Sequence, residues 1–424
     1  MLILWLAFTY LGCVSKFIVT LTGGFGYVTI SWAFFLYFAV FYLDGLKSWK
    51  KSLTMFLPFL VFAAVYSIQF QFVFRSAPVT ENAVSAILGK GVKIDVWNMF
   101  LLLPFVGSCV FLLIKSDAQM KYIVKYVTLM IFGVASVYGF IMGLIDPNFI
   151  RNTAAGTSDS FVTYGTIYAL VILIPVVLYL AVRAQGKKKA AFVAISLLYI
   201  GCVMVVEFFI GIIATVVGIV LFVFGLIKNK RLMITLAVAL FVLVLFLAVT
   251  GYYADLLRGI ARIVPLDYIG ERIEQTILFL ETGELEGSGI RFEMYFDTFL
   301  MFLKHPFFGN IIWYPDATDF FVNEAGKTAI YCGHSTNLDV LSCCGILVFS
   351  LYAYFFVIMC KEGLRGKTGL EKYTVLISAG LYIFISSVNT VFGVAQILPA
   401  IIFLVPCLMQ KDIEIGMLTG EELL

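Results

Sequence analysis

Long apolar runs separated by short polar loops are the dominant pattern along this chain. A helix needs about 20 apolar residues to cross about 30 Å of hydrocarbon. Runs of this kind predict twelve spans, at residues 2–20, 26–43, 53–74, 96–114, 121–145, 161–182, 190–206, 208–227, 231–251, 336–359, 373–389 and 391–409. The stretch 190–227 is too long for one span, so we expect a break near Glu207. The pattern therefore predicts an all-α polytopic membrane protein with about twelve transmembrane helices.

Basic residues occupy every second loop, and this alternation predicts the face on which each loop lies. The basic loops hold Lys47, Lys50 and Lys51; Lys115 and Lys121; Arg183, Lys187, Lys188 and Lys189; Lys228, Lys230 and Arg231; and Lys361, Arg365, Lys367 and Lys372. Such loops are typical of the cytoplasmic face, so both termini are expected there. The predicted division is nine spans over 1–251, a large outer loop over 252–335, three spans over 336–410 and a cytoplasmic tail over 411–424.

The outer loop is too long for a simple connection, and its sequence predicts helices. Apolar residues recur at helical spacing opposite a polar face, as in Ile269, Ile273, Ile277 and Leu280 against Glu271, Arg272, Glu274 and Gln275. This spacing predicts an amphipathic helix. Residues 292–303 are more apolar and predict a second helix along the membrane surface. The alternative is that the whole loop only covers the bundle as a lid.

Composition agrees with a lipid environment and narrows the chemistry. The 424 residues are 62% hydrophobic and 13% charged, with a mean hydropathy of +1.02, whereas soluble domains carry about 25% charged residues. The eight cysteines form no CxxC pair or His/Cys cluster, so neither a zinc site nor a disulfide framework is expected. Phosphate-loop, HExxH and dinucleotide motifs are lacking, so the substrate itself is expected to carry the energy for any reaction.

Candidate reactive residues gather in or near the outer loop. His334 directly precedes a span, where an imidazole could take a proton from a sugar hydroxyl. The alternative is that it merely caps the helix or anchors it at the membrane interface. Arg291 opens the second loop helix and could bind a pyrophosphate, or could pair with Glu293 or lipid headgroups. Glu207 is a candidate because ionisable residues inside spans are rare, although solvation at a span end explains it too. His305 is expected mainly to end a helix.

Three segments resemble the O-antigen ligase and polymerase superfamily. One runs from Ser288 through Arg291 to the His-Pro-Phe-Phe-Gly turn at 305–309, and another is Gly333-His334-Ser335-Thr336-Asn337-Leu338-Asp339-Val340-Leu341 followed by Gly345. A weaker one is Arg151 with Gly156 before the span at 161–182. The resemblance implies a glycosyltransferase that acts on undecaprenyl-pyrophosphate-linked glycans without a metal or cofactor. It also implies that Arg291 and His334 occupy the catalytic positions.

This sequence departs from the family pattern at one place. Many members carry Ser-Arg-Gly near the start of the span that begins here around residue 208, where this chain has Phe209-Ile210-Gly211. The role of the missing cation is expected to pass to Arg151, Arg258, Arg262 or Arg272. Glu207 and Asn337 complete the predicted substrate-binding set.

The expected function is polymerisation of lipid-linked repeat units on the outer face of the bacterial cytoplasmic membrane. A ligase of the same superfamily, a flippase or transporter for lipid-linked sugars, and a non-catalytic scaffold are the alternatives. Expected partners are the carrier-linked glycan, membrane lipids and a chain-length regulator, and no nucleic acid. The prediction requires Arg291 and His334 to share one pocket at the outer membrane boundary.

Overall fold

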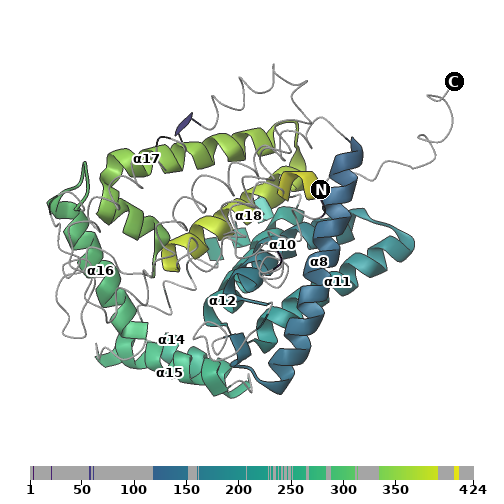
Figure 1. The fold of residues 1–424 in the computed structure, drawn as a ribbon. Coiled ribbons are helices and arrows are strands. Elements are labelled where there is room, and N and C mark those ends of the chain that lie inside the picture. The colour runs from purple at the N-terminus through teal and green to yellow at the C-terminus, as the bar shows by residue number, and fades with distance from the viewer. Residues whose placement is uncertain are drawn as a thin grey trace.

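The computed structural model describes residues 118–150, 162–206, 208–227, 252–263, 267–282, 288–310, 334–389 and 405–409, with a few isolated positions besides. Every element in these ranges is helical (Figure 1). The predicted spans at 2–20, 26–43, 53–74, 96–114, 231–251 and 391–409 lie wholly or mostly outside the described residues. The predicted all-α class is therefore confirmed for the described part, while the count of twelve stays a prediction.

Six long helices form the bundle, each at a predicted span: α8 (Ala118–Ile145), α10 (Tyr164–Arg183), α11 (Gly186–Val205), α12 (Phe209–Leu226), α17 (Thr336–Leu364) and α18 (Gly369–Val388). By length and hydropathy, five of them can cross a membrane, α18 being the exception. Two charged residues, Glu371 and Lys372, stand in the first turn of α18 and lower its hydropathy. The break predicted near Glu207 is confirmed, because α11 ends at Val205 and α12 begins at Phe209.

Helix α10 is the centre of this bundle and packs against α8, α11, α12 and α18. Its residues from Ile167 to Ile174 are almost wholly buried. Small residues let the neighbouring helices approach closely: Gly139 and Gly143 of α8 lie against Cys202 and Val205 of α11. Close approach through small residues is a usual means of helix association in lipid, where the hydrophobic effect does not drive helices together.

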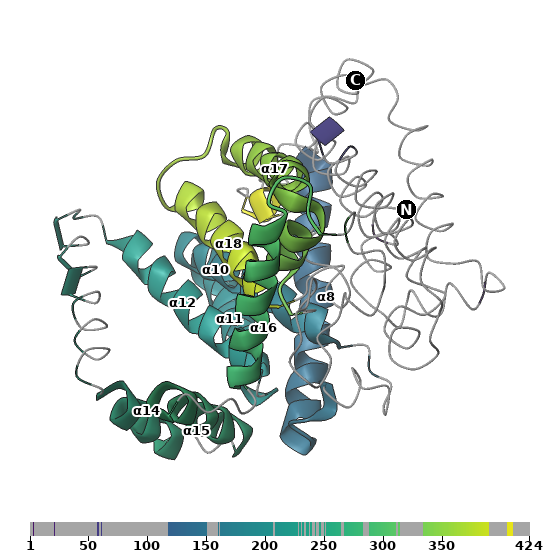
Figure 2. The same cartoon turned by 90° about the vertical axis from the view of Figure 1, so that its left-hand side faces the viewer.

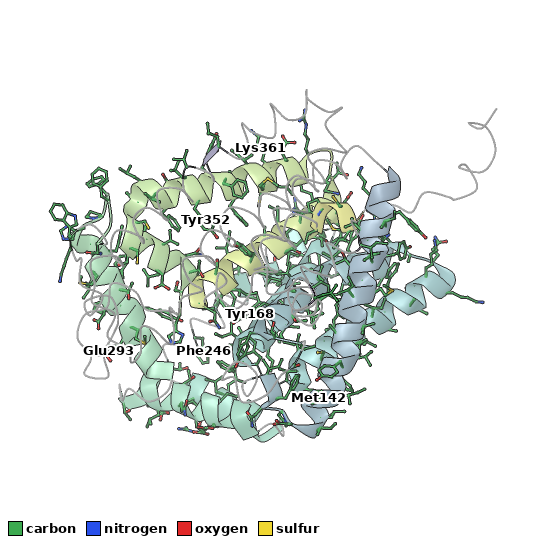
Figure 3. All side chains as sticks on the ribbon, in the orientation of Figure 1. Met142, Tyr168, Phe246, Glu293, Tyr352 and Lys361 are labelled. Atoms are coloured by element: carbon green, nitrogen blue, oxygen red, sulfur yellow. The ribbon has the colours of Figure 1, made fainter. Side chains whose placement is uncertain are left out.

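The basic loops share one end of the bundle. Gly225, near the end of α12, packs against Tyr373 at the start of α18. Arg183 ends α10, which packs on both of these helices. Lys361, near the end of α17, lies at the edge of the molecule opposite Met142 of α8 (Figure 3). The loops after α10, α12 and α17 therefore lie on one side, as the predicted alternation requires.

Aromatic and amide side chains gather at the other end. The rings of Tyr164 and Tyr168 pack on Phe208 with centroids 4.8 and 4.9 Å away. The amide of Asn389, which follows α18, donates to the Tyr168 hydroxyl, and the Asn389 carbonyl accepts from Thr336 N at 3.3 Å. The starts of α10, α12 and α17 thus meet the end of α18.

The large loop contains three helices: α14 (Tyr252–Ile263), α15 (Asp267–Thr282) and α16 (Ser288–Lys304). The predicted amphipathic helix is confirmed as α15, with Ile273 and Ile277 buried against Ala254 of α14 and against the start of α12. Figure 2 shows α14 and α15 together below α12, with α16 alongside α17. A helix over 292–303 is confirmed within α16, which packs on α17 and leaves Phe296 and Leu303 exposed. Its position along the membrane surface stays a prediction.

Candidate functional site

The two sequence motifs of the loop region meet at a break in α17. Gly345 has φ 78° and ψ 174°, which interrupts the helix. A broken spanning helix needs other partners for its backbone groups. Those partners come from the turn after α16: Ile346 N donates to the Pro306 carbonyl at 2.8 Å, and Leu347 N donates to the Phe307 carbonyl at 3.3 Å. The turn at 306–310 therefore replaces part of the helix's own hydrogen bonding. We call this contact the α16–α17 interlock.

Asn310 completes the interlock. The Ser342 carbonyl, which Ile346 N would reach in an unbroken helix, accepts instead from Asn310 N at 2.9 Å and from Asn310 Nδ2 at 3.0 Å. The same Nδ2 also donates to the Met301 carbonyl at 2.8 Å. Asn310 is completely buried, so its amide joins the end of α16 to the break in α17 away from solvent.

Two glycines allow the interlock to form. Gly309 and Gly345 both have positive φ, at 76° and 78°. A Cβ on Gly309 would come closer than 3.0 Å to the backbone of Cys343, and a Cβ on Gly345 would come equally close to the backbone of Phe307. Both positions therefore need the φ freedom of glycine and its lack of a side chain. The two sequence motifs that carry the family resemblance are therefore in direct contact in the structure.

His334 lies directly before α17, where its backbone is held from α16. The Tyr295 hydroxyl is 3.3 Å from the His334 carbonyl and 3.0 Å from the Val388 carbonyl. The N-cap of α17 is Ser335, whose Oγ accepts from Leu338 N at 3.2 Å. Ser335 supplies this cap, so the alternative that His334 caps the helix is wrong, while an anchoring role for His334 at the interface stays a prediction.

Arg291 belongs to the helix that touches His334. It lies in α16 one turn before Tyr295, and residues four apart share a helix face. The turn of α16 that carries Arg291 is therefore next to the turn that reaches the His334 backbone. The Arg291 side chain is outside the described part of the structure, as are the side chains of Arg262 and Arg272 and the whole of Arg151 and Glu207.

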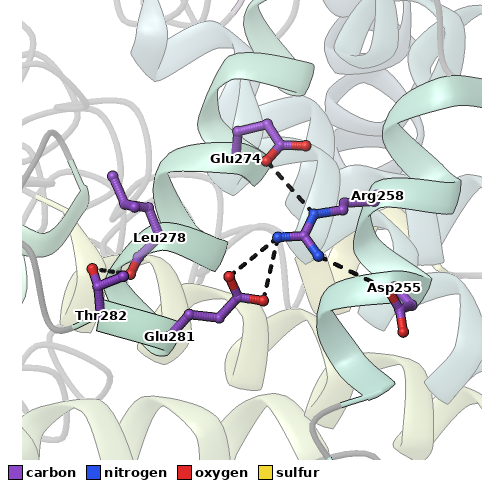
Figure 4. A network of polar contacts seen from close by, with 6 residues as sticks. All are labelled: Asp255, Arg258, Glu274, Leu278, Glu281 and Thr282. Atoms are coloured by element: carbon purple, nitrogen blue, oxygen red, sulfur yellow. Dashed lines mark hydrogen bonds and ion pairs between the residues drawn. The ribbon is translucent and has the colours of Figure 1, made fainter.

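Two further predicted residues have defined partners. The Asn337 amide donates to Ser386 Oγ and Ser387 Oγ, both at 2.9 Å, and so joins α17 to α18. Arg258 pairs with Glu281 at 3.1 Å, Asp255 at 3.9 Å and Glu274 at 4.0 Å (Figure 4). These contacts connect α14 to α15.

The other histidine lies at the end of α16. The helix ends at Lys304, as the sequence predicted for this position. The His305 ring stacks on Trp313, with centroids 5.0 Å apart and planes 15° apart. Its backbone carbonyl accepts from Gly309 N at 2.9 Å within the interlock turn.

The sequence reasoning missed Asp339. This residue is only 3% exposed and lies in the first turn of α17, five positions after His334. Its backbone N donates to the Ser335 carbonyl at 2.8 Å. An ionisable group inside a span is a functional candidate by default, and a helix N-terminus favours a carboxylate. The available signal was an acidic residue within the predicted span at 336–359.

These features define a class: a multi-pass helical membrane protein with its polar candidate site at one end of the bundle, opposite the basic loops. One comparison with known protein families finds a match. Residues 210–353 match the family model described as O-antigen ligase, a segment that runs from α12 through both motifs and the break in α17. This match supports the predicted resemblance to the O-antigen ligase and polymerase superfamily. No curated protein matches the chain.

Proposed function

We propose that this protein is a membrane glycosyltransferase that polymerises undecaprenyl-pyrophosphate-linked repeat units of a surface polysaccharide on the outer face of the cytoplasmic membrane. The observation that carries the proposal is the contact of Tyr295 with the His334 carbonyl. It brings the helix that bears Arg291 against the residue expected to handle the proton. The matched family, whose members are glycosyltransferase-like ligases and polymerases, supports the same reaction class.

In the proposed reaction a hydroxyl of the acceptor sugar attacks the anomeric carbon of the donor. The bond from that carbon to the pyrophosphate oxygen breaks, and the bonding electron pair leaves with the pyrophosphate. His334 takes the hydroxyl proton, and general-base help of this kind contributes about 10²–10⁴ in rate. Arg291 stabilises the negative charge that develops on the leaving oxygen. A single displacement inverts the configuration at the anomeric carbon.

Preorganisation around His334 supports this assignment. Its carbonyl is contacted by Tyr295, and the next residue, Ser335, is fixed as the cap of α17. A base must stay within hydrogen-bond reach of the proton it removes, so a fixed backbone on rigid helices favours catalysis. Asp339 in the adjoining helical turn would favour the imidazolium that forms when His334 takes the proton, because a nearby negative charge stabilises a positive one.

We propose that a few individual cations bind the donor pyrophosphate. Of the cations proposed for it, Arg258 already contacts three carboxylates. Arg291 is therefore our first choice for the leaving phosphate, with Arg151, Arg262 and Arg272 as further candidates. The proposal includes no metal ion.

A ligase that transfers a finished glycan to a lipid core is the second candidate, because the matched family model is described by that activity. Both reactions use the same donor and the same base. They differ in the acceptor, which is a lipid-linked repeat unit for a polymerase and a lipid core for a ligase.

The test is His334→Ala in the native host, with the surface glycan separated by size on a gel. A polymerase defect leaves single repeat units, whereas a ligase defect leaves full-length chains on the carrier lipid. His305→Ala is the matched control, because its ring stacks on Trp313 beyond the end of α16, and it should preserve the ladder. Immunoblotting of membranes checks that both variants accumulate. A normal ladder from accumulated His334→Ala protein would reject both reactions.

A further inference from the structure

A groove lies between α8 and α11. Its volume is about 910 Å³, within the range of about 300–1,000 Å³ that is usual for cavities that hold small ligands. Its wall is almost entirely apolar, and Met130, Val134 and Ile141 in it are each more than half exposed. Because these helices are long and apolar enough to span a membrane, we expect lipid to be the medium at the groove.

The groove has one polar end. Helices α8 and α11 run in the same direction, since Lys125 lies over the Phe192 ring near their starts and Gly143 meets Val205 near their ends. Lys188, Tyr122 and the adjacent Tyr126 all line the groove near these starts. Lys188 and two tyrosines therefore lie at one end, and the rest of the lining is apolar apart from Tyr138.

Lys125 strengthens the positive character of that end. It is 4% exposed, and its Nζ is 5.4 Å from the Tyr126 ring centroid and 5.7 Å from that of Phe192. The residues that line the groove include Lys188 and no carboxylate. Lys188 can contact the phosphate of a lipid at this end, and basic pockets between spanning helices commonly bind anionic lipid headgroups.

We propose that this groove binds an anionic phospholipid, with its phosphate beside Lys188 and one acyl chain along α8. Tyrosines at a membrane interface have a polar tip for the headgroup and an apolar ring for the chain. Tyr122 and Gly133 are eleven residues apart, about 16 Å along a helix, which is about half the hydrocarbon thickness. A chain from one leaflet thus reaches Gly133.

The proposed lipid does not lie where the glycan donor would react. Its phosphate would lie at the end of the bundle that carries the basic loops, whereas His334 lies at the opposite end. The inference therefore does not depend on the proposed reaction.

Gly133 provides a way to block the groove without disturbing the helices. A Cβ on Gly133 would meet nothing within 4 Å, and Gly133 lines the groove. Gly133→Leu therefore places a side chain in the space of the acyl chain. Gly380→Leu is the matched control, because Gly380 is equally open but lies on the exposed side of α18.

The test uses full-length protein in phosphatidylethanolamine vesicles that contain a trace of photoreactive phosphatidylglycerol or photoreactive phosphatidylcholine. Crosslinked peptides are mapped by mass spectrometry. We expect phosphatidylglycerol to label α8 and α11 about fivefold more than phosphatidylcholine does, the factor that one lysine near an anionic headgroup supplies. Lys188→Gln should remove most of this preference. Gly133→Leu should remove most of the labelling by phosphatidylglycerol, and Gly380→Leu should preserve it.

Equal labelling by the two lipids would overturn the proposal, as would unchanged labelling of Gly133→Leu. Displacement of the probe by polyprenyl phosphate at lower concentrations than by unlabelled phosphatidylglycerol would also overturn it, since the occupant would then be an isoprenoid carrier. Absence of the α8 and α11 peptides from the map, with labelling elsewhere, would show that another segment fills the groove.

Discussion

The α16–α17 interlock and the α8–α11 groove both depend on glycine, for opposite reasons. At the interlock, Gly309 and Gly345 allow two backbones to touch, and a Cβ on either would overlap the other segment. At the groove, Gly133 faces open space that a side chain could fill. The missing side chain thus permits contact in one region and leaves a cavity in the other. The sequence alone does not distinguish these two uses of glycine. Only the neighbouring segment decides whether the missing side chain allows a contact or leaves a space.

Among the substitutions that test this contrast, Gly345→Ala should have the largest effect on stability. Alanine there must adopt φ 78° and also overlap the Phe307 carbonyl, so we expect destabilisation of about 2–4 kcal/mol and loss of most folded protein. The yield of monodisperse protein after detergent extraction is the measurement. Gly133→Ala is the control and should keep a normal yield. Equal yields of the two variants would show that the interlock does not form.

The next largest effect should come from Asn310→Ala. The change removes one buried amide that donates to the Met301 and Ser342 carbonyls. The Ser342 carbonyl keeps its bond from the backbone N of residue 310, whereas the Met301 carbonyl loses the Asn310 donor. We expect a loss of about 1–3 kcal/mol, seen as a lower melting temperature in detergent. Gln185→Ala, at an exposed position whose side chain makes no cap hydrogen bond, should change the melting temperature little. A melting temperature unchanged by Asn310→Ala would place the stability of this region elsewhere.

Tyr295→Phe tests whether the contact between α16 and the His334 carbonyl matters for activity. The variant keeps the ring and loses only the hydroxyl that contacts the His334 and Val388 carbonyls. We expect stability to fall by about 1 kcal/mol and the polymerisation rate to fall about tenfold, since Tyr295 positions His334.

Two readouts separate positioning from a general loss of stability in that variant. A positioning role lowers kcat with little change in KM and shifts the pH profile of the rate, because the environment of the base changes. Tyr354→Phe, on the exposed face of α17, is the control and should leave both readouts unchanged. Parallel loss of activity and folded protein, with a constant pH profile, would assign Tyr295 a structural role only.

The sequence predicted local features of this fold well. The isoleucine spacing of α15 and the break between α11 and α12 follow from local periodicity and from the length of an apolar run, and both are present. The sequence reasoning did not separate α14 as a helix of its own, because it follows the apolar stretch at 231–251 directly. Both motifs that meet at the interlock were recognised, but their contact was not. That contact joins residues about 36 positions apart through backbone hydrogen bonds, which have no side-chain signature.

Hydropathy did not predict which helices are buried within the bundle. The apolar windows of α10 and α12 have hydropathies of 2.4 and 2.8, yet 89% of the first and only 28% of the second is buried. The more apolar helix is the more exposed one, because lipid solvates apolar side chains as well as a protein core does. Hydropathy also does not report that the Asp339 carboxylate is buried at the start of α17, so this residue was not singled out from the sequence.

The smallest expected effect concerns Arg258, and it decides between two roles. Its contacts with Glu281, Glu274 and Asp255 are partly exposed, so Arg258→Gln should cost under about 1 kcal/mol of stability. If Arg258 only connects α14 to α15, activity stays near normal, and the exchange Arg258→Glu with Glu281→Arg restores the melting temperature. A large loss of activity that this exchange does not restore would instead identify Arg258 as the phosphate-binding cation, since the guanidinium would then be needed at that position itself. The pair of variants thus tests whether α14 and α15 only brace the bundle or also bind the donor.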